Sequence, residues 1–514
     1  MLPGGGVTVR ALMQYGFVID HRRCIGCHAC TVACKSENQV PVGSFRTWVK
    51  YTEIGTFPQV RRHFAVLRCN QCTNAPCVTI CPVNALAKRP DGIVDLDKDA
   101  CIGCKACMQA CPYDALYLNE DTGGAEKCHF CAHRVEQGLK PACEIVCPTE
   151  AIVSGDMHDE ASRVSRMKHE ADAVARRVEQ GTGPNVWYLG MDAVSLHPGR
   201  AAEPATYLWS ERRLPPPPYP EGAIELAPHA RTVLDTSHPA HWGWRVDAYL
   251  VTKGLAAGAG MLAPFAAALG LAGNALAYLP EAVALALTAI TCVLLVADLK
   301  RPLLFFRLLT RPNTKSWLVK GGWVLSGFMA LAAAGVALRV SGLHAAADAV
   351  RWPLALLGAA TAGYTALLFR QCEGRDLWQK TGLLLPHLLV QAVMLGGTVF
   401  LLAAPGAGLA WLTAIAVGLH FVCIFCEKSG SHATDNAKQA AALLGVIPAW
   451  PGARVSALLA ATISAAAAAL GLLIAASTAT VSVPLALAAS LTLVAGTFFW
   501  ERAYIRAGQL PPLS

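Results

Sequence analysis

Charged residues are scarce in this sequence. Asp, Glu, Lys and Arg make up 15% of the 514 residues, 54% of the residues are hydrophobic, and the mean hydropathy is +0.39. Soluble domains carry about 25% charged residues, so the composition excludes an ordinary soluble protein and indicates a membrane protein. The scarcity is local, because the 272 residues from Gly243 onward hold only 27 of the 78 charged side chains. Two physically different parts are joined in one chain.

The first part lacks long apolar runs. Residues 15–156 contain short strand-like segments, such as Tyr15–Asp20, and turns punctuated by cysteine. Such a segment buries little apolar surface, so bound metal is expected to supply part of the stability that a hydrophobic core would otherwise give. No secretory leader is expected either, because Cys24 follows Arg22-Arg23 where an export signal needs an apolar stretch.

A basic stripe interleaved with aromatic residues is also missing from the first part. The net charge of +8 therefore predicts no nucleic-acid partner. Much of the positive excess lies between the apolar segments of the second part, where membrane topology explains it better.

Cysteine is abundant, and it is concentrated in the first part. Sixteen of the 20 cysteines fall between Cys24 and Cys147, in four tight groups whose spacing disulfides do not explain. The groups are Cys24, Cys27, Cys30 and Cys34; Cys69, Cys72, Cys77 and Cys81; Cys101, Cys104, Cys107 and Cys111; and Cys128, Cys131, Cys143 and Cys147.

The first and third groups share the spacing C-x2-C-x2-C-x3-C, which is the bacterial ferredoxin run. Three closely spaced thiolates hold one cluster and the fourth reaches a second cluster, so such groups work in pairs. The alternatives are zinc, which also takes four cysteines, and buried inert cysteine. The repeated spacing and the Cys-Pro endings favour iron-sulfur clusters. The remaining cysteines are predicted to be packing residues of membrane helices: Cys292, Cys372, Cys423 and Cys426.

After Trp242 the sequence contains eight apolar stretches near the length that spans a bilayer. They cover residues 246–272, 279–298, 321–340, 352–369, 381–404, 408–426, 455–476 and 481–500. Eight spans place both ends of this part on one side, where 15 Lys and Arg residues lie, against Arg339 and Arg351 on the other. The positive-inside rule then predicts a multi-pass protein of a bacterial inner (cytoplasmic) membrane with the cysteine-rich part on the cytoplasmic face, unless some of these arginines bind a partner instead.

A Pro-rich stretch at 213–220 predicts a stiff spacer between the two parts. The predicted organisation is therefore a cluster-binding domain over residues 1–200, a Pro-rich linker over 201–241 and a membrane domain over 242–514.

The first part resembles the four-cluster iron-sulfur subunits of molybdopterin oxidoreductases, such as dimethyl sulfoxide, polysulfide and tetrathionate reductases. The matching motifs are Cys69-Asn70-Gln71-Cys72, Cys101-Ile102-Gly103-Cys104 and Lys127-Cys128-His129-Phe130-Cys131. The resemblance implies four 4Fe-4S clusters. Their ligand sets would be Cys24, Cys27, Cys30 and Cys147; Cys34, Cys128, Cys131 and Cys143; Cys69, Cys72, Cys77 and Cys111; and Cys81, Cys101, Cys104 and Cys107.

The second part resembles the membrane anchors of polysulfide reductases, whose eight helices carry a quinone site and no haem. The resemblance rests on Trp242-Gly243-Trp244, Gly254–Gly258, Asp298–Pro302, Tyr364-Thr365 and Ala507-Gly508-Gln509. It implies ubiquinone or menaquinone as an exchangeable substrate. In the family pattern the helix-one position that faces quinone is usually histidine, whereas this chain has Tyr249.

Five polar residues of the apolar stretches are predicted to lie near the same membrane face. Their depth follows from their position in each predicted helix, in which every residue advances by about 1.5 Å along the axis. Buried polar residues in a membrane are a functional hypothesis by default, and a quinone needs hydrogen-bond donors and proton carriers. The candidates are Asp247, Tyr249, Tyr364, His387 and His420. The alternatives are interfacial tyrosine anchors and structural histidines, and His387 with His420 also permits haem b between two helices.

The predicted fold is α+β: a double ferredoxin-like iron-sulfur domain followed by an all-α eight-helix transmembrane bundle. The predicted function is an electron-transfer and membrane-anchor subunit with a separate molybdopterin catalytic subunit, in sulfite oxidation or in dimethyl sulfoxide or polysulfide reduction. Its other partners would be membrane lipid and quinone. The alternatives are a subunit of a quinol-oxidising assembly resembling alternative complex III, a hydrogenase electron-transfer module, and a zinc scaffold without redox chemistry.

Overall fold

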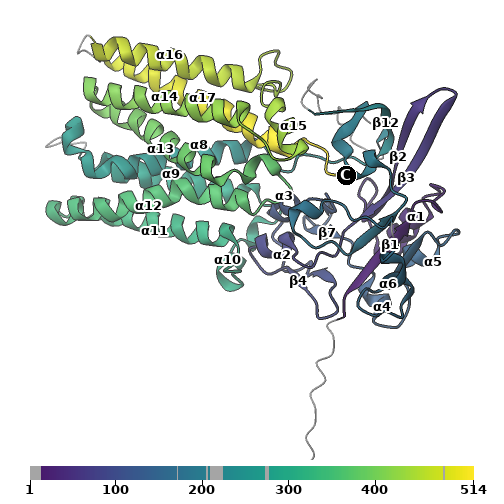
Figure 1. Ribbon diagram of the computed structural model, residues 1–514. Helices are drawn as coiled ribbons and strands as arrows, with labels where there is room; N and C mark the ends of the chain where they lie inside the picture. The colour runs from purple at the N-terminus through teal and green to yellow at the C-terminus, as the bar shows by residue number, and fades with distance from the viewer. Residues whose placement is uncertain (1–12, 171, 204–206, 209–223, 272–276, 478–480) are drawn as a thin grey trace, which may run out of the picture. The chain divides into compact units, whose positions relative to one another are not determined.

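The computed structural model describes residues 13–170, 172–203, 207–208, 224–271, 277–477 and 481–514. The chain forms two compact units (Figure 1). The first comprises residues 1–216, 225–239 and 512–514, and the second comprises residues 217–224 and 240–511.

The centre of the first unit is a three-stranded sheet. Strand β1 (Tyr15–Asp20) pairs antiparallel with β8 (Ile152–Asp156) and parallel with β9 (Val186–Leu189). Phe17, Val18 and Ile19 are fully buried, because a central strand presents both of its faces to neighbouring layers. The strand predicted at Tyr15–Asp20 is confirmed.

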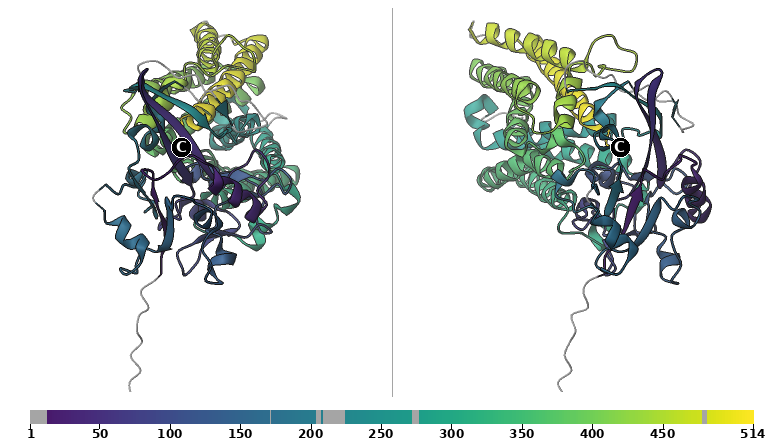
Figure 2. Two further views of the ribbon diagram at one scale, coloured as in Figure 1. Left: turned by 90° about the vertical axis from the view of Figure 1, so that its right-hand side faces the viewer. Right: turned by 45° about the vertical axis from the view of Figure 1, so that its right-hand side comes forward.

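A second sheet is built on the hairpin of β2 (Thr47–Thr56) and β3 (Gln59–Arg68), which Figure 2 shows as a long ribbon in purple. Strand β12 (Ala227–Asp235) pairs with the other edge of β2 and also carries β10 (Ala201–Glu203) and β11 (Tyr207–Leu208). Residues 227–235 thus form a strand within the stretch predicted as a linker. The predicted Pro-rich spacer at 213–220 lies outside the described residues.

Three of the short helices begin at Ala29, Ala106 and Ala132 in the cysteine turns, each directly after a residue in the left-handed conformation, which does not occur inside a helix. Two small hairpins, β4 (Leu86–Lys88) with β5 (Val94–Leu96) and β6 (Leu116–Leu118) with β7 (Ala125–Lys127), lie between the groups. The short helices are α1 (Ala29–Asn38), α2 (Pro76–Ile80), α3 (Ala106–Ala110), α4 (Ala132–Val135), α5 (Ala142–Ile145), α6 (Arg163–Lys168), η1 (Val178–Gln180), α7 (Ala193–Leu196) and η2 (Pro198–Arg200).

The second unit is helical. Its long helices are α8 (Trp244–Leu262), α9 (Leu279–Asp298), α11 (Trp317–Val340), α12 (His344–Arg370), α13 (Thr381–Ala403), α14 (Ala407–Ser429), α16 (Ala457–Ser477) and α17 (Val483–Gln509). Shorter elements join them: η3 (Ala263–Phe265), η4 (Ala267–Leu271), η5 (Pro302–Leu304), α10 (Arg307–Thr310), η6 (Asp376–Gln379) and α15 (Asp435–Leu443).

Seven of these helices, α9, α11, α12, α13, α14, α16 and α17, are long and apolar enough to cross a membrane. The first predicted span corresponds to α8, which is not among them because Arg245, Asp247 and Lys253 lie within its 19 residues. The structure therefore supports a multi-pass helical region with seven candidate spans in the described part of the chain. The predicted count of eight is not confirmed.

Helix α8 nevertheless packs inside the second unit, against α9, α12, α13 and α17. Its backbone touches that of α13 at Gly258, where an added Cβ would overlap the carbonyl of Ala392 and the backbone of Gly396. Small residues at such a crossing allow two helices to approach closely.

A partly exposed ionic contact ties residues after β12 to the rest of the first unit. His238 Nδ1 lies 2.6 Å from the Asp114 carboxylate, and His238 Nε2 lies 3.1 Å from the Ser514 hydroxyl. Burial favours the neutral ring, but Asp114 and Asp235 outweigh that effect and raise the pKa of His238 to about 10. His238 is therefore charged at neutral pH.

We expect His238→Asn to weaken β12 at pH 6 and to have little effect at pH 10. The raised pKa means that the charged ring stabilises the fold fully below its unfolded pKa of 6.5. That contribution falls as pH rises through about 10. Hydrogen exchange of the β12 amides should show a loss of about 2 kcal/mol of opening free energy at pH 6. The exposed-site variant His158→Asn is the control, and an equal loss at both pH values would contradict the assignment.

Candidate functional site

Four cysteines from distant segments line one cavity in the first unit. Cys34 comes from α1, Cys128 and Cys131 from the turn before α4, and Cys143 from α5. Asn38, Arg46 and Arg68 contribute to the same cavity. The fourth cysteine of the first group thus faces the first three cysteines of the last group. These four positions, called here the Cys34 set, are the ones that the resemblance assigned to one cluster.

The other thiols also have cysteine neighbours from two groups. Burial raises the pKa of the Cys24 thiol, and the nearby Cys147 and Cys27 raise it further. Burial and the neighbours Cys69, Cys111 and Cys77 raise the pKa of the Cys72 thiol. Burial likewise raises the pKa of Cys107, with Cys104, Cys101 and Cys81 as its strongest thiol neighbours. Each neighbourhood contains members of one predicted ligand set.

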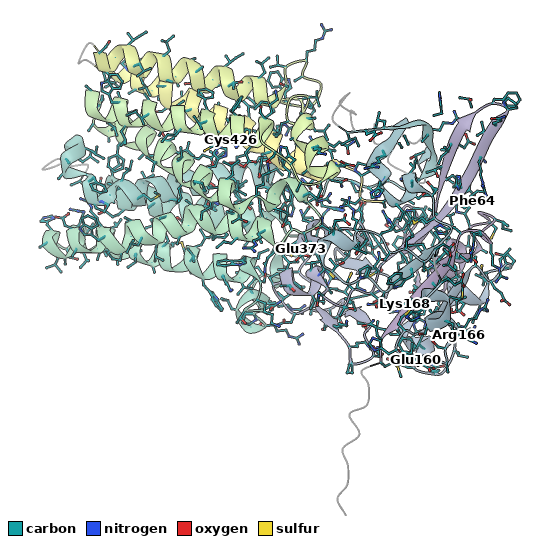
Figure 3. All side chains as sticks on the ribbon, viewed as in Figure 1. Phe64, Glu160, Arg166, Lys168, Glu373 and Cys426 are labelled. Carbon is teal, nitrogen blue, oxygen red and sulfur yellow. The ribbon has the colours of Figure 1, made fainter. Side chains whose placement is uncertain are left out.

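The cysteine turns place backbone amides around the thiols. Gly26 and Gly103 have φ of 71° and 69°, and the residues two positions later, His28 and Lys105, have φ of 59° and 63°. A Cβ at Gly26 would lie 2.6 Å from the ring of Phe64, a residue of β3 that Figure 3 labels. Left-handed residues of this kind build concave amide nests that suit an anion. A cluster held by four thiolates is such an anion, so the residues present fit an iron-sulfur group.

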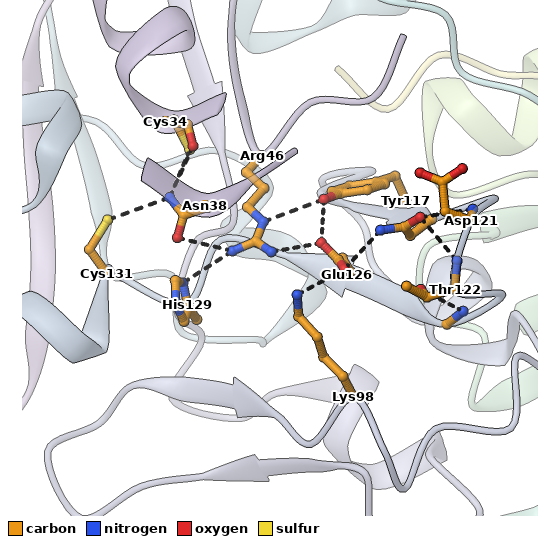
Figure 4. Close-up of polar contacts among 12 residues, drawn as sticks. Cys34, Asn38, Arg46, Lys98, Tyr117, Asp121, Thr122, Glu126, His129 and Cys131 are labelled. Atoms are coloured by element: carbon orange, nitrogen blue, oxygen red, sulfur yellow. Dashed lines mark hydrogen bonds and ion pairs between the residues drawn. The ribbon is translucent and has the colours of Figure 1, made fainter. Parts of the chain in front are cut away.

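Side-chain donors also reach the sulfur atoms of the Cys34 set. Asn38 Nδ2 lies 3.7 Å from Cys34 Sγ and 3.8 Å from Cys131 Sγ, and Arg68 Nη1 donates to Cys143 Sγ at 3.1 Å. Figure 4 shows Asn38 between the two cysteines, with its amide oxygen accepting from Arg46. Arg46 in turn forms a buried ion pair with Glu126 at 2.7 Å.

The sets differ in exposure. Cys27 is exposed, and Cys24, Cys147 and Cys104 are half-buried, whereas the remaining twelve cysteines of the four groups are buried. Two exposed apolar residues are sequence neighbours of these accessible cysteines: Ile25, next to Cys24, is 58% exposed, and Val146, next to Cys147, is 39% exposed. The thiols of Cys24, Cys27 and Cys147 are therefore the most accessible from outside the unit.

The cysteines outside the groups form no comparable cluster. Cys423 and Cys426 lie on α14, where Figure 3 labels Cys426. Nowhere in the described residues does a group of three or more His, Cys, Asp and Glu side chains close on a single metal ion. Cys372 is buried, and its thiol contacts the Leu368 carbonyl at 3.6 Å.

All five polar residues predicted for the membrane part are buried. Asp247 lies 3.9 Å from the Arg502 guanidinium of α17. The Lys253 ammonium of α8 lies 4.9 Å from the centre of the Tyr364 ring of α12 and is hydrogen-bonded to Thr365. Asp247 and Lys253 therefore have separate partners on different helices.

His387 and His420 lie in direct contact. His387 Nε2 and His420 Nδ1 are 2.8 Å apart, and Trp500 packs against the His387 ring. A haem between two axial histidines needs the iron and its macrocycle between the rings. The two rings hydrogen-bond to each other instead, so this arrangement does not accommodate the haem alternative.

Two functional candidates were missed in the sequence. Gln391 of α13 donates to Glu501 of α17 at 2.9 Å, and Glu501 is buried beside Arg502. The sequence predicts that the last apolar stretch ends at residue 500, whereas α17 continues to Gln509. Because α17 continues past the apolar stretch, it carries Glu501 and Arg502 into the bundle. These two charged residues, directly after Trp500, are the sequence signal for a functional site at this end of the helix.

Comparisons with known proteins match both units. A 4Fe-4S dicluster domain model matches residues 60–157, and a polysulphide reductase NrfD model matches residues 232–408. A tetrathionate reductase subunit of Salmonella typhimurium is 47% identical over 204 residues, which are 38% of this chain and 80% of the relative.

Two further relatives match the same part of the chain. A putative dimethyl sulfoxide reductase iron-sulfur subunit of Halobacterium salinarum is 40% identical over 219 residues, 37% of this chain and 82% of the relative. One of the polysulfide reductase chains of Wolinella succinogenes is 38% identical over 179 residues, 34% of this chain and 94% of the relative.

Proposed function

Because this protein belongs to the family of iron-sulfur subunits of tetrathionate, dimethyl sulfoxide and polysulfide reductases and carries an NrfD-type membrane domain, we propose that it transfers electrons between membrane quinone and a separate catalytic subunit. The observation that carries the proposal is the presence, in one chain, of thiol sets that fit iron-sulfur groups and a helical region with buried proton-carrying side chains. The predicted division into a cluster domain, a linker over residues 201–241 and a membrane domain is part of the proposal, with residues 227–235 of the linker serving as strand β12 of the first unit.

We propose four 4Fe-4S clusters, one for each predicted ligand set. Such a cluster, when bound, carries one electron at a time. The convergence of Cys34 with Cys128, Cys131 and Cys143 around one cavity supports the pairing of the first and last groups. The thiol neighbours of Cys72 and Cys107 support the pairing of the second and third groups.

The set of Cys24, Cys27, Cys30 and Cys147 is proposed as the place where electrons pass to or from the catalytic partner. Its support is the exposure of Cys27 and of the apolar Ile25 and Val146 nearby. Exposed apolar side chains in a patch favour docking of another protein. A molybdopterin subunit is the proposed partner, with a sulfur or sulfoxide compound, such as sulfite, dimethyl sulfoxide or polysulfide, as the substrate of the assembled complex.

The quinone site is proposed among Asp247, Tyr249, Tyr364, His387 and His420. The His387–His420 hydrogen bond supports a role in proton transfer, because two hydrogen-bonded imidazole rings can pass a proton along when one ring accepts a proton and the other releases one. Tyr364 and Tyr249 supply phenolic donors for quinone oxygen atoms. Lys253 and Glu501 join this proposed group because both are buried and hydrogen-bonded to helices that carry its members. Lys253 bonds to Thr365 of α12, and Glu501 bonds to Gln391 of α13.

We also propose that α8 is an eighth span and that the cluster domain faces the cytoplasm in a bacterial inner membrane. The Lys and Arg distribution of the sequence supports this orientation. Both Arg339 and Arg351, the arginines predicted on the other side, form ion pairs with Glu281, so they are held inside the fold.

The function is tested by mixing the purified protein with a reduced quinone analogue without oxygen and following cluster reduction by electron paramagnetic resonance (EPR). Tyr249→Phe and His387→Ala are expected to slow quinol-driven reduction by at least about tenfold, since they remove a donor and a proton carrier. Reduction by dithionite should be unchanged.

Tyr278→Phe, at the exposed residue before α9, and His344→Ala, at the exposed first residue of α12, are the matched controls. Loss of the cluster signals in Tyr249→Phe or His387→Ala would identify a structural contact. Unchanged quinol-driven rates in both variants would remove these residues from the proposed site.

A further inference from the structure

Arg68 is a buried cation in contact with the Cys34 set. It ends strand β3, is 1% exposed, and its Nη1 donates to Cys143 Sγ at 3.1 Å. The guanidinium carbon lies 4.4 Å from the centre of the Phe17 ring. A rigid strand and a buried aromatic ring therefore hold the charge against one thiol of the set.

No carboxylate within the described residues lies at ion-pair distance from Arg68; its Nη1 donates to Cys143, and its Nε and Nη2 atoms have no hydrogen-bond partner there. Arg46, which lines the same cavity, differs because Glu126 neutralises it at 2.7 Å. An isolated buried charge is strongly unfavourable, so a guanidinium in this position needs an anion as its partner. The groups next to Arg68 that carry negative charge when deprotonated are the thiols of Cys143 and Cys128 in the Cys34 set and of Cys30 in the neighbouring set.

Asn38 adds to the same effect on the other side of the cavity. Its amide lies 3.7 Å from Cys34 Sγ and 3.8 Å from Cys131 Sγ. Three of the four thiols of the Cys34 set thus receive a side-chain N–H group, from Arg68 or Asn38. Hydrogen bonds to the sulfur atoms and nearby charge are two of the factors that set the reduction potential of a cluster.

We propose that Arg68 is a redox-tuning residue whose uncompensated positive charge raises the reduction potential of the cluster held by the Cys34 set. The proposal rests on the ligand set proposed above. In the transfer, a neighbouring donor would be oxidised by one electron and the iron of the bound cluster reduced by one electron, with no bond formed or broken and one negative charge added to the cluster. Arg68 would stabilise the more negative, reduced form more strongly than the oxidised form.

The test is a redox titration of the purified full chain, with dithionite as reductant and EPR as the readout. Arg68→Met is expected to lower the equilibrium constant for reduction of this cluster at least tenfold, which is about 59 mV for a one-electron couple. Arg68→Lys keeps the charge and should restore most of the potential. Arg62→Met, on the exposed part of the same strand, is the control and should leave the potential unchanged.

Iron content distinguishes the possible failures. A wild-type protein without clusters would refute the proposed function itself. A full iron content with an unchanged potential in Arg68→Met would refute the role of Arg68 alone. If Arg68→Met loses the cluster, the charge-keeping Arg68→Lys is compared with a neutral Arg68→Gln variant that keeps its iron. The expected result is that Arg68→Lys has the reduction potential of the wild type. A reduction potential in Arg68→Lys that is shifted as far as in Arg68→Gln would overturn the proposal.

Discussion

Cys34→Ala and Cys143→Ala are expected to abolish the same EPR signal and to lower the iron content from about 16 to about 12 atoms per protein molecule. Cys34 belongs to the first group in the sequence, yet it faces Cys128, Cys131 and Cys143 across one cavity. Cys24→Ala should abolish a different signal, because Cys24 has Cys147 and Cys27 as its thiol neighbours. Iron and acid-labile sulfide analysis together with EPR of the reduced protein measure this result.

Cys372→Ala is the matched control, because Cys372 is equally buried but lies outside the four groups. It should keep all of the iron. If Cys34→Ala and Cys24→Ala instead removed the same signal, the groups would bind clusters separately and the proposed crossover would be wrong. Zinc in place of iron and sulfide would establish the zinc-scaffold alternative.

Glu281→Gln is expected to destabilise the helical unit by about 3 kcal/mol or more, because it leaves buried arginines without their counter-charge. Glu281 is fully buried at the start of α9 and accepts hydrogen bonds from Arg351 at 2.6 Å and from Arg339 at 3.2 Å. Arg351 also donates to the Ala277 carbonyl at 2.5 Å. The thermal unfolding midpoint of the detergent-solubilised protein, followed by helical circular dichroism, measures the loss.

Asp348→Asn is the control for this substitution. Asp348 pairs with the same two arginines, but its side chain is 60% exposed, so the loss should stay below about 1 kcal/mol. Iron content should be unchanged in both variants, since the substitutions lie in the helical unit. An equal effect of the two substitutions would show that burial of Glu281 does not govern the stability of this contact.

The membrane residues show where prediction from the sequence succeeds and where it fails. Long apolar runs predicted the positions of α9, α11, α12, α13, α14, α16 and α17, because a bilayer-spanning helix is a local property of about 20 consecutive residues. The same rule ended the last run at residue 500 and so excluded Glu501 and Arg502. Their burial depends on contacts with Gln391 and Asp247 from other helices, which no local window contains.

The histidines lead to the same conclusion. The sequence placed His387 and His420 at a similar depth, and that left both haem ligation and proton transfer open. Their direct hydrogen bond depends on the rotation of α13 and α14 about their axes, which packing against Trp500 helps to fix. Depth follows from counting residues, whereas orientation requires the neighbouring helices.

The sequence by itself determined that sixteen cysteines occur in four groups, that their spacing fits iron-sulfur clusters, and that the rest of the protein is apolar enough for a membrane. These properties are local, since they depend on residues within a few positions of one another. Only the tertiary structure brought Cys34 to Cys143 and left Arg68 buried against that thiol without a carboxylate among the described residues. Residues so distant in the sequence meet because the sheet of β1, β8 and β9 and the hairpin of β2 and β3 pack into one core, and such contacts depend on the whole fold.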